Sequence, residues 1–328
     1  MSKDHFVAQT YLKHFGDATR GGMLHAYRKS NDAPFPCWPK DVCHEWGGDL
    51  NLAFLVDRPE LLGDFRKIFE PHWNLSVANI LSGTVSHNDK FVVSGYMANL
   101  MTCAPAWRRV GVESHNRMAT GFLSFAKKMK EKHGGQPELP VEAIESLQRS
   151  EIGLDTDADY IKAITTRQLL DHAWCTYNQD WAVLANATAQ PFVTSDNPVA
   201  LCWSGNPCEP MTRFLSITPR LCLSVTYKNL SKTRLDINDP SRELTKIPDG
   251  MVTHRRVNVT AAKFINRHIV QCAEDLVFSS TESTGIAQLV KKYARYRMTP
   301  EYVEFPGNED NSMYDGVIIR VREVSHQN

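Results

Sequence analysis

The chain has 328 residues, of which 42% are hydrophobic and 23% are charged, a balance typical of a globular protein and unlike that of a disordered chain. Basic and acidic residues number 37 each, so the formal net charge is zero, and attraction to nucleic acid or to an anionic membrane would need a local patch. No apolar run approaches the roughly 20 residues that cross a bilayer, which predicts a protein without membrane contact.

The N-terminal segment and the cysteines bear on the cellular compartment. Met1-Ser-Lys-Asp-His5 is not followed by the apolar stretch of a secretory signal. The eight cysteines are scattered along the chain without a Cys-x-x-Cys pair. Such cysteines are mostly free thiols or small buried hydrophobic groups in a reducing compartment. These features predict a cytoplasmic protein.

The first elements are short. Apolar residues recur at helical spacing over residues 6–15, which predicts an amphipathic helix. After Gly21-Gly22, the segment 23–28 is typical of a strand, and the proline-rich stretch 33–39 is typical of a loop.

Residues 58–180 are mainly helical in pattern. Apolar stripes predict helices over residues 91–102, 110–132 and 157–180, besides one that begins near residue 58. Gly134-Gly135 gives a strong helix end.

The pattern changes after residue 180 to short, often alternating apolar runs separated by turn residues. We predict strands at 181–187, 192–194, 199–203, 214–217 and 221–226. A helix over 252–273, a strand at 276–279, a basic amphipathic helix over 285–297 and a closing strand or hairpin at 313–324 follow.

Helices grouped in the middle and strands grouped later predict an α+β fold. We expect the helical section 58–180 to pack against a mostly antiparallel sheet formed by N-terminal and later segments, with 181–228 rich in strands. Residues 1–280 would form one domain, and 281–328 a C-terminal extension with the basic helix and the closing strand.

Two motifs carry a family likeness. His5-Phe-Val-Ala-Gln9-Thr-Tyr-Leu-Lys-His-Phe15 and Thr194-Ser-Asp-Asn-Pro-Val199 resemble the opening and internal motifs of domain-of-unknown-function family 4238. Segments 96–108 and 265–279 are similar to its middle helix and to its closing helix and strand. The likeness spans roughly residues 4–280. The family has no agreed activity, so the resemblance implies no reaction, cofactor or partner.

The chain departs from the family pattern at two places. Ala8 stands where the family usually has proline, which changes only a preference at a helix start. Cys103-Ala104-Pro105 stands where the family often has Arg-Thr-Pro. The second departure removes a positive charge, so a role of that family arginine does not carry over to this chain.

The leading candidate site combines the two motifs. His5 and Asp196 could bind a divalent metal ion or act as a general acid–base pair. Asn197, Gln9 and Asn266 would orient them, Gln9 from one helical turn after His5. A structural interpretation stands beside this one. Ser-Asp-Asn-Pro also makes a stable turn, and His5 could support the first helix.

A serine-enzyme pattern is also present in part. Ser124-Phe-Ala-Lys127 and Ser195-Asp196-Asn197 match two motifs of penicillin-recognising enzymes. The third motif, Lys-Thr-Gly, is replaced by Lys232-Thr233-Arg234, so we regard the match as chance.

Two further clusters carry metal-ligating or titratable types. Cys37, Cys43, His44, Cys202 and Cys208 could make a zinc site, although their spacing is wider than usual and free thiols are the simpler interpretation. Asp171, His172 and Asp180 lie on or beside one predicted helix, where a packed or capping histidine is the simpler interpretation.

Basic residues gather in two places. Arg255, Arg256, Lys291, Lys292 and Arg295, interleaved with tyrosines in the second place, could hold a phosphate-bearing or nucleic-acid substrate. A solvated basic helix face is the alternative.

The sequence contains none of the nucleotide-binding, α/β-hydrolase or zinc-protease signatures. Our leading hypothesis is a hydrolase, such as a metal-dependent phosphodiesterase or a nuclease-like effector, with catalysis at His5 and Asp196. The alternative is a non-catalytic binding or interaction protein in which both motifs are structural.

Overall fold

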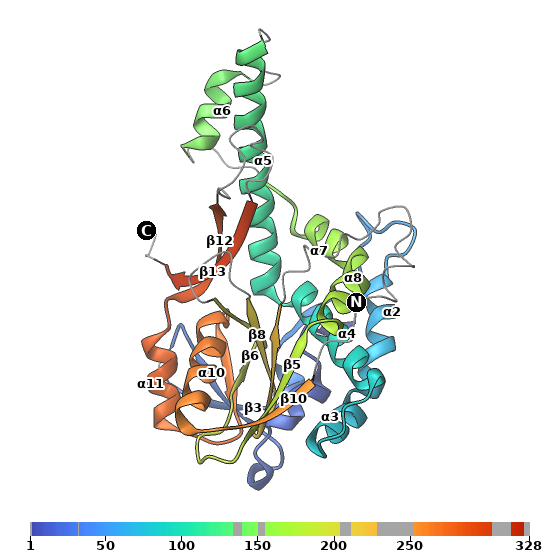
Figure 1. Cartoon of the computed structure of the whole chain (residues 1–328), viewed down its shortest axis with the longest axis vertical. Coiled ribbons are helices and arrows are strands. Elements are labelled where there is room, and N and C mark those ends of the chain that lie inside the picture. The colour runs from blue at the N-terminus through green and yellow to red at the C-terminus, as the bar shows by residue number, and fades with distance from the viewer. Residues whose placement is uncertain are drawn as a thin grey trace.

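The computed structural model has an α+β architecture in which helices cover both sides of mainly antiparallel sheets (Figure 1). Helices of the middle section lie on one side and α10 and α11 on the other, while α5 extends away from the body (Figure 1). The fold class predicted from the sequence is therefore confirmed. The structure describes residues 2–31, 33–133, 140–149, 155–203, 211–227, 252–303 and 316–324.

The N-terminal segment begins as a strand. β1 (Lys3–His5) pairs with β4 (His44–Trp46) in an antiparallel two-stranded ribbon. The helix predicted over 6–15 is shorter than expected, with α1 (Gln9–Leu12) followed by the 3-10 turn η1 (Lys13–Phe15). Its start is delayed because the Phe6 N–H donates to the Cys43 carbonyl across the ribbon.

Strand β2 (Leu24–Arg28) confirms the strand expected after Gly21-Gly22. The stretch 33–39, expected to be a loop, instead contains β3 (Phe35–Cys37). β3 is an edge strand next to β2, a position where Pro36 is tolerated because an edge strand need not donate every N–H. The 3-10 turns η2 (Ala18–Arg20) and η3 (Pro39–Asp41) flank these strands.

The helical section packs mainly around α4, which is buried along most of its length. The helix expected over 157–180 divides at Gln168 into α7 and α8, and strand β5 already begins at Asp180. The helix expected from Val110 begins earlier, at Pro105, which suits the first helical position because proline lacks an N–H. The elements are α2 (Leu61–Phe69), η4 (Glu70–His72), α3 (Trp73–Leu81), α4 (His87–Cys103), α5 (Pro105–His133), α6 (Val141–Gln148), α7 (Ala158–Arg167) and α8 (Leu169–Tyr177).

The larger sheet has the strand order β10-β5-β9-β8-β7. All its pairs are antiparallel except β10 with β5, which run parallel. Its strands are β5 (Asp180–Asn186), β7 (Val199–Cys202), β8 (Thr212–Thr218), β9 (Leu221–Thr226) and β10 (Val252–Val257). The helix expected over 252–273 was wrong in its first part. Residues 252–257 pair with β5, and α10 (Val259–Cys272) begins only after the Asn258 cap.

The second sheet joins the two ends of the family-like region, in the order β3-β2-β11-β6. β6 (Thr194–Ser195) and β11 (Leu276–Ser279) belong to it. The basic helix is shorter than expected, because α11 (Thr284–Lys292) ends before β12 (Tyr296–Val303), which pairs with β13 (Gly316–Glu323). This hairpin packs beside the first half of α5.

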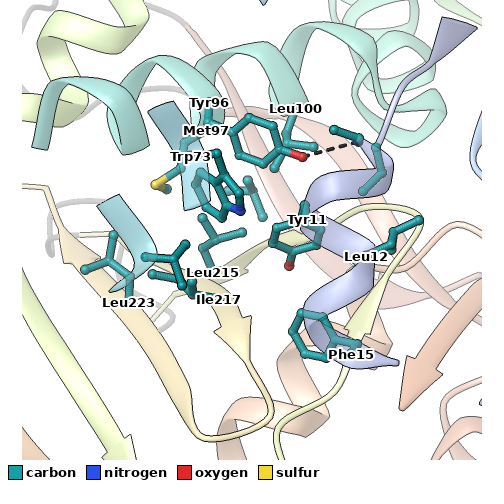
Figure 2. Close-up of a cluster of buried hydrophobic side chains, with 14 of the residues drawn as sticks. Tyr11, Leu12, Phe15, Trp73, Tyr96, Met97, Leu100, Leu215, Ile217 and Leu223 are labelled. Carbon is teal, nitrogen blue, oxygen red and sulfur yellow. Dashed lines mark hydrogen bonds between the residues drawn. The ribbon is translucent and has the colours of Figure 1, made fainter. Parts of the chain in front are cut away.

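The largest core cluster lies between the sheets and the helices α1, α3 and α4 (Figure 2). Tyr11, Trp73 and Tyr96 are fully or almost fully buried in it, and the rings of Trp73 and Tyr96 have centroids 4.4 Å apart. The Tyr11 hydroxyl lies 2.7 Å from Thr194 Oγ1 and donates to the Ser216 carbonyl at 2.6 Å. The opening motif thus reaches the sheet through a tyrosine.

Gly95 of α4 lets another helix approach closely. A Cβ atom at this position would lie 2.0 Å from a ring carbon of Phe69 on α2. We expect Gly95→Ala to lower the free energy of unfolding by about 1–3 kcal/mol, because overpacking displaces the ring or the helix. Urea denaturation measures the change. Gly285→Ala on α11, where the nearest atom is 3.6 Å away, is the control and should cost nothing; equal losses in both variants would contradict the packing argument.

Candidate functional site

Asp196, the acid of the internal motif, binds backbone N–H groups through its carboxylate. Its side chain is 6% exposed. Oδ1 accepts the Glu274 N–H at 2.9 Å, and Oδ2 accepts the N–H groups of Asp275 and Leu276 at 2.8 and 2.9 Å. Three convergent N–H groups occupy the carboxylate and fix the turn that joins α10 to β11. We call this arrangement the Asp196 clamp.

Lys29 completes the clamp from the end of β2. Its Nζ donates to the carbonyls of Gln271, Ala273 and Tyr296 at 3.2, 2.6 and 2.6 Å. Burial lowers the pKa of Lys29 to about 8, against the attraction of the nearby Asp196. Burial also raises the pKa of Asp196 to about 6, although the three N–H donors and Lys29 oppose the shift. Burial is therefore the main cause of both shifted pKa values, and each charge partly opposes the shift of the other.

The two asparagines of the predicted site also hold the backbone. Asn197 Nδ2 donates to the Cys272 carbonyl at 2.8 Å. Asn266 accepts the Val193 N–H at 3.1 Å and donates to the Pro191 carbonyl at 2.8 Å. Asn197 and Asn266 are each 1% exposed. Both link α10 to the segment around β6, as Asp196 does.

His5 lies apart from the clamp. It ends β1, its Nε2 is 3.2 Å from the Lys40 carbonyl oxygen, and its ring meets that of His44 edge-on at 5.5 Å. Burial lowers the pKa of His5. Gln9 opens α1. Within the described part of the chain, no hydrogen bond or ion pair joins His5 or Gln9 to Asp196, so the geometry does not form the predicted pair.

The ribbon formed by β1 and β4 has two different faces. Asp4 pairs with Glu45 and His5 with His44. Because side chains alternate along a strand, the two acids point one way and the two histidines the other. The acidic face meets the helical section, where Arg108 of α5 binds Glu45 at 3.2 and 2.7 Å. His5 is thereby directed away from that acidic face.

A cluster of charged side chains surrounds Arg66 on the acidic side of the ribbon. We call it the Arg66 cluster; its members are Glu45, Asp49, Arg66, Glu70, Asn99, Cys103, Arg108 and Lys162. Arg66 is 8% exposed and forms an ion pair with Asp49 at 2.7 Å. Lys162 of α7 donates to the Gly48 carbonyl and lies 3.9 Å from Glu45. The cluster connects the ribbon with α2, η4, α4, α5 and α7.

Arg66 also lies beside Cys103, the first residue of the second departure from the family pattern. Its Nε donates to Asn99 Oδ1 at 3.4 Å, and the thiol of Cys103 donates to the same oxygen. Burial raises the pKa of Cys103, against the nearby Arg66. A guanidinium from α2 therefore lies beside Cys103 of α4, the position at which the family resemblance implies an arginine.

Two carboxyl groups of the Arg66 cluster have raised pKa values. Burial raises the pKa of Asp49 and of Glu70, although Arg66 lowers both. A raised carboxyl pKa is one feature of the acids and bases found at functional sites. Sequence analysis missed this cluster, because its members come from segments far apart and follow no short motif. The only signal was the Arg-Thr-Pro departure at Cys103.

The predicted basic residues divide between two places. Arg255 and Arg256 are exposed on β10. Lys291 and Lys292 end α11, whereas Arg295 pairs with Glu323 of β13 at 3.3 Å. Arg255 and Arg256 therefore lie on a different element from Lys291, Lys292 and Arg295, and α10 contacts both β10 and α11.

The remaining candidates find little support. Across the described ranges, no three His, Cys, Asp or Glu side chains gather as metal ligands would; Cys208, part of the zinc hypothesis, lies outside those ranges. Ser124 lies on α5, and 232–234 lie outside the described residues. His172 is on α8, where burial lowers its pKa. Asp171 precedes it on α8, and Asp180 opens β5.

Comparison with known proteins gives one family. A family model described as "Protein of unknown function (DUF4238)" matches residues 3–283. No curated protein and no solved structure matches the chain. None of the helices that the structure describes combines the length and apolar character needed to cross a membrane.

Proposed function

The chain belongs to the DUF4238 family, and we propose that it is a binding or interaction protein in which the His5 and Ser195–Pro198 motifs are structural. The observation that carries this proposal is the Asp196 clamp, in which three backbone N–H groups occupy the carboxylate. A general base or a metal ligand needs a free lone pair directed at a ligand. Three of the roughly four acceptor positions of the Asp196 carboxylate bind N–H groups of the turn after α10.

The same reasoning covers the opening motif. Tyr11 and Leu12 are fully buried, and Tyr11 reaches both Thr194 and Ser216. The motif therefore docks the N-terminal segment on the sheet. We infer from this arrangement that the motif makes the body rigid and that the functional residues lie on its surface. A cytoplasmic location stays part of the proposal and is supported by the free thiols of the seven described cysteines.

Hydrolysis of a phosphodiester by a metal-dependent site stays a prediction, and the geometry gives it no support at His5 and Asp196. If the chain does catalyse a reaction, the Arg66 cluster holds the better acid–base groups, because Asp49 and Glu70 have raised pKa values and Asp49 is 24% exposed. A binding function needs no acid–base group, which is why we prefer it to hydrolysis.

The proposal is tested with His5→Gln and Asp196→Asn, measured beside the parent for hydrolysis of bis(4-nitrophenyl) phosphate and of a labelled oligonucleotide, with Mg²⁺ or Mn²⁺. We expect no turnover above background in any of the three proteins. We also expect a lower free energy of unfolding for Asp196→Asn, because one amide cannot accept three N–H groups. Metal-dependent hydrolysis that the folded His5→Gln variant loses tenfold would overturn the proposal.

A further inference from the structure

We propose that the exposed face of α10, together with β10, binds single-stranded nucleic acid, an inference that rests on the proposed binding function and names its ligand. We call this surface the α10 face; it consists of Arg255, Lys263, Phe264, Arg267 and His268. The chain as a whole has no net charge, so a local excess of positive charge marks a candidate for polyanion binding.

The first observation is the charge of this segment. Residues 251–273 contain four arginines or lysines and no aspartate or glutamate. Arg255 and Lys263 are exposed, and within the described ranges neither forms an ion pair with a carboxylate. Unpaired surface cations attract phosphate groups and release counterions when they bind them.

The second observation is an exposed aromatic ring within this charge. Phe264 is 41% exposed although it lies on a helix that packs against the sheet. The guanidinium of Arg267 lies 5.0 Å from its ring centroid, and the His268 ring lies 4.3 Å away. The Nε of Arg267 is buried without a hydrogen-bond partner among the described residues. An exposed aromatic ring beside a cation is a platform on which unpaired bases stack.

The register of the sheet places Arg255 on the same side as Phe264. Arg255 is in register with Leu184, which belongs to the core cluster beneath α10, and Phe264 contacts Phe214 of that cluster. Arg256 pairs with Ala185 and points to the opposite side. Phe214, which Phe264 contacts, lies on β8, and three strand spacings of about 4.8 Å separate β8 from β10. A few nucleotides can span this distance.

Single strands are favoured over a duplex or an acidic protein for one reason. A duplex keeps its bases stacked inside and offers mainly phosphate groups to a convex helix, whereas a single strand offers both phosphates and free base faces. An acidic peptide would use the cations but would gain little from the Phe264 ring. The combination of ring and cations on the α10 face therefore fits an unpaired strand best.

The test uses the full chain and a fluorescein-labelled 15-nucleotide oligo(dT) or oligo(U) in anisotropy titrations at several salt concentrations. We expect tighter binding of the single strand than of a duplex of equal length. Arg255→Ser should reduce the slope of log Kd against log salt by about 0.7, the value for one phosphate contact on a single strand. Arg256→Ser, a neighbour with the same charge change, is the matched control and should leave the slope unchanged.

Stacking is tested separately. Phe264→Ala should weaken binding about 5- to 100-fold with the salt slope unchanged, and Phe264→Tyr should retain affinity, which guards against a folding defect. The inference is overturned if the parent binds no oligonucleotide, if both arginine variants behave alike, or if Phe264→Ala binds normally. Equal competition by polyglutamate would also overturn it and would indicate an acidic protein partner. Because none of these residues belongs to the Asp196 clamp, such a failure leaves the unfolding and hydrolysis tests of the proposed function independent.

Discussion

Asp196→Ala is expected to lower the free energy of unfolding by about 3–5 kcal/mol, a range typical of removing one partner from a buried charged group. The variant would leave the N–H groups of Glu274, Asp275 and Leu276 without their acceptor, and each such buried group costs about 1–3 kcal/mol. Lys29 would also lose its nearby negative charge. Urea denaturation followed by tryptophan fluorescence measures the loss.

Asp57→Ala is the matched control, because Asp57 is exposed on the loop before α2 and surface substitutions of this kind change stability by less than about 0.5 kcal/mol. A loss below about 1 kcal/mol for Asp196→Ala would show that the clamp does not hold the turn. The motif would then need another explanation, and a functional role for Asp196 would again be favoured.

Arg66→Met is expected to cost about 3–5 kcal/mol at neutral pH, because it leaves buried carboxylates without their cation. Asp49 would lose its ion pair and Glu70 the positive charge of Arg66, which lowers the pKa of both. Thermal or urea unfolding at pH 7.5 measures the loss. The double variant Arg66→Met with Asp49→Asn should recover part of it, since one uncompensated charge is removed.

The Arg66→Met loss should depend on pH in a defined direction. The folded-state pKa values of Asp49 and Glu70 lie above their ordinary values of 3.8 and 4.5, and they rise further without Arg66. The folded state then binds more protons than the unfolded state, so its stability falls as the pH rises through those raised values. The difference in the free energy of unfolding between parent and variant should therefore become smaller as the pH is lowered from 7.5 to 5. A constant difference would contradict the assignment.

Local pattern allowed much of the fold to be predicted. The alternation of Leu221–Thr226 gave strand β9 with its observed ends. Where the sequence misled, long-range pairing decided the outcome. Residues 252–257 form a strand because they pair with β5, some 70 positions earlier, and that partner is invisible to a local pattern.

The candidate site was harder to predict for the same reason. Asp196, Asn197 and Asn266 were predicted as site residues, yet the sequence could not show that their partners are backbone groups of Pro191, Cys272 and residues 274–276. A polar motif that binds backbone and one that binds a ligand use the same residue types. Only the direction of each hydrogen bond separates them.

The second sheet has a consequence for how the chain acquires its structure. β2 lies between β3 and β11, so residues 24–28 gain their second neighbour only from residues 276–279. Closing so long a loop delays folding. On the ribosome, β2 would therefore lack this neighbour until nearly the whole family-matched region has been synthesised. Any fragment that stops before residue 276 should stay incompletely folded and prone to aggregate.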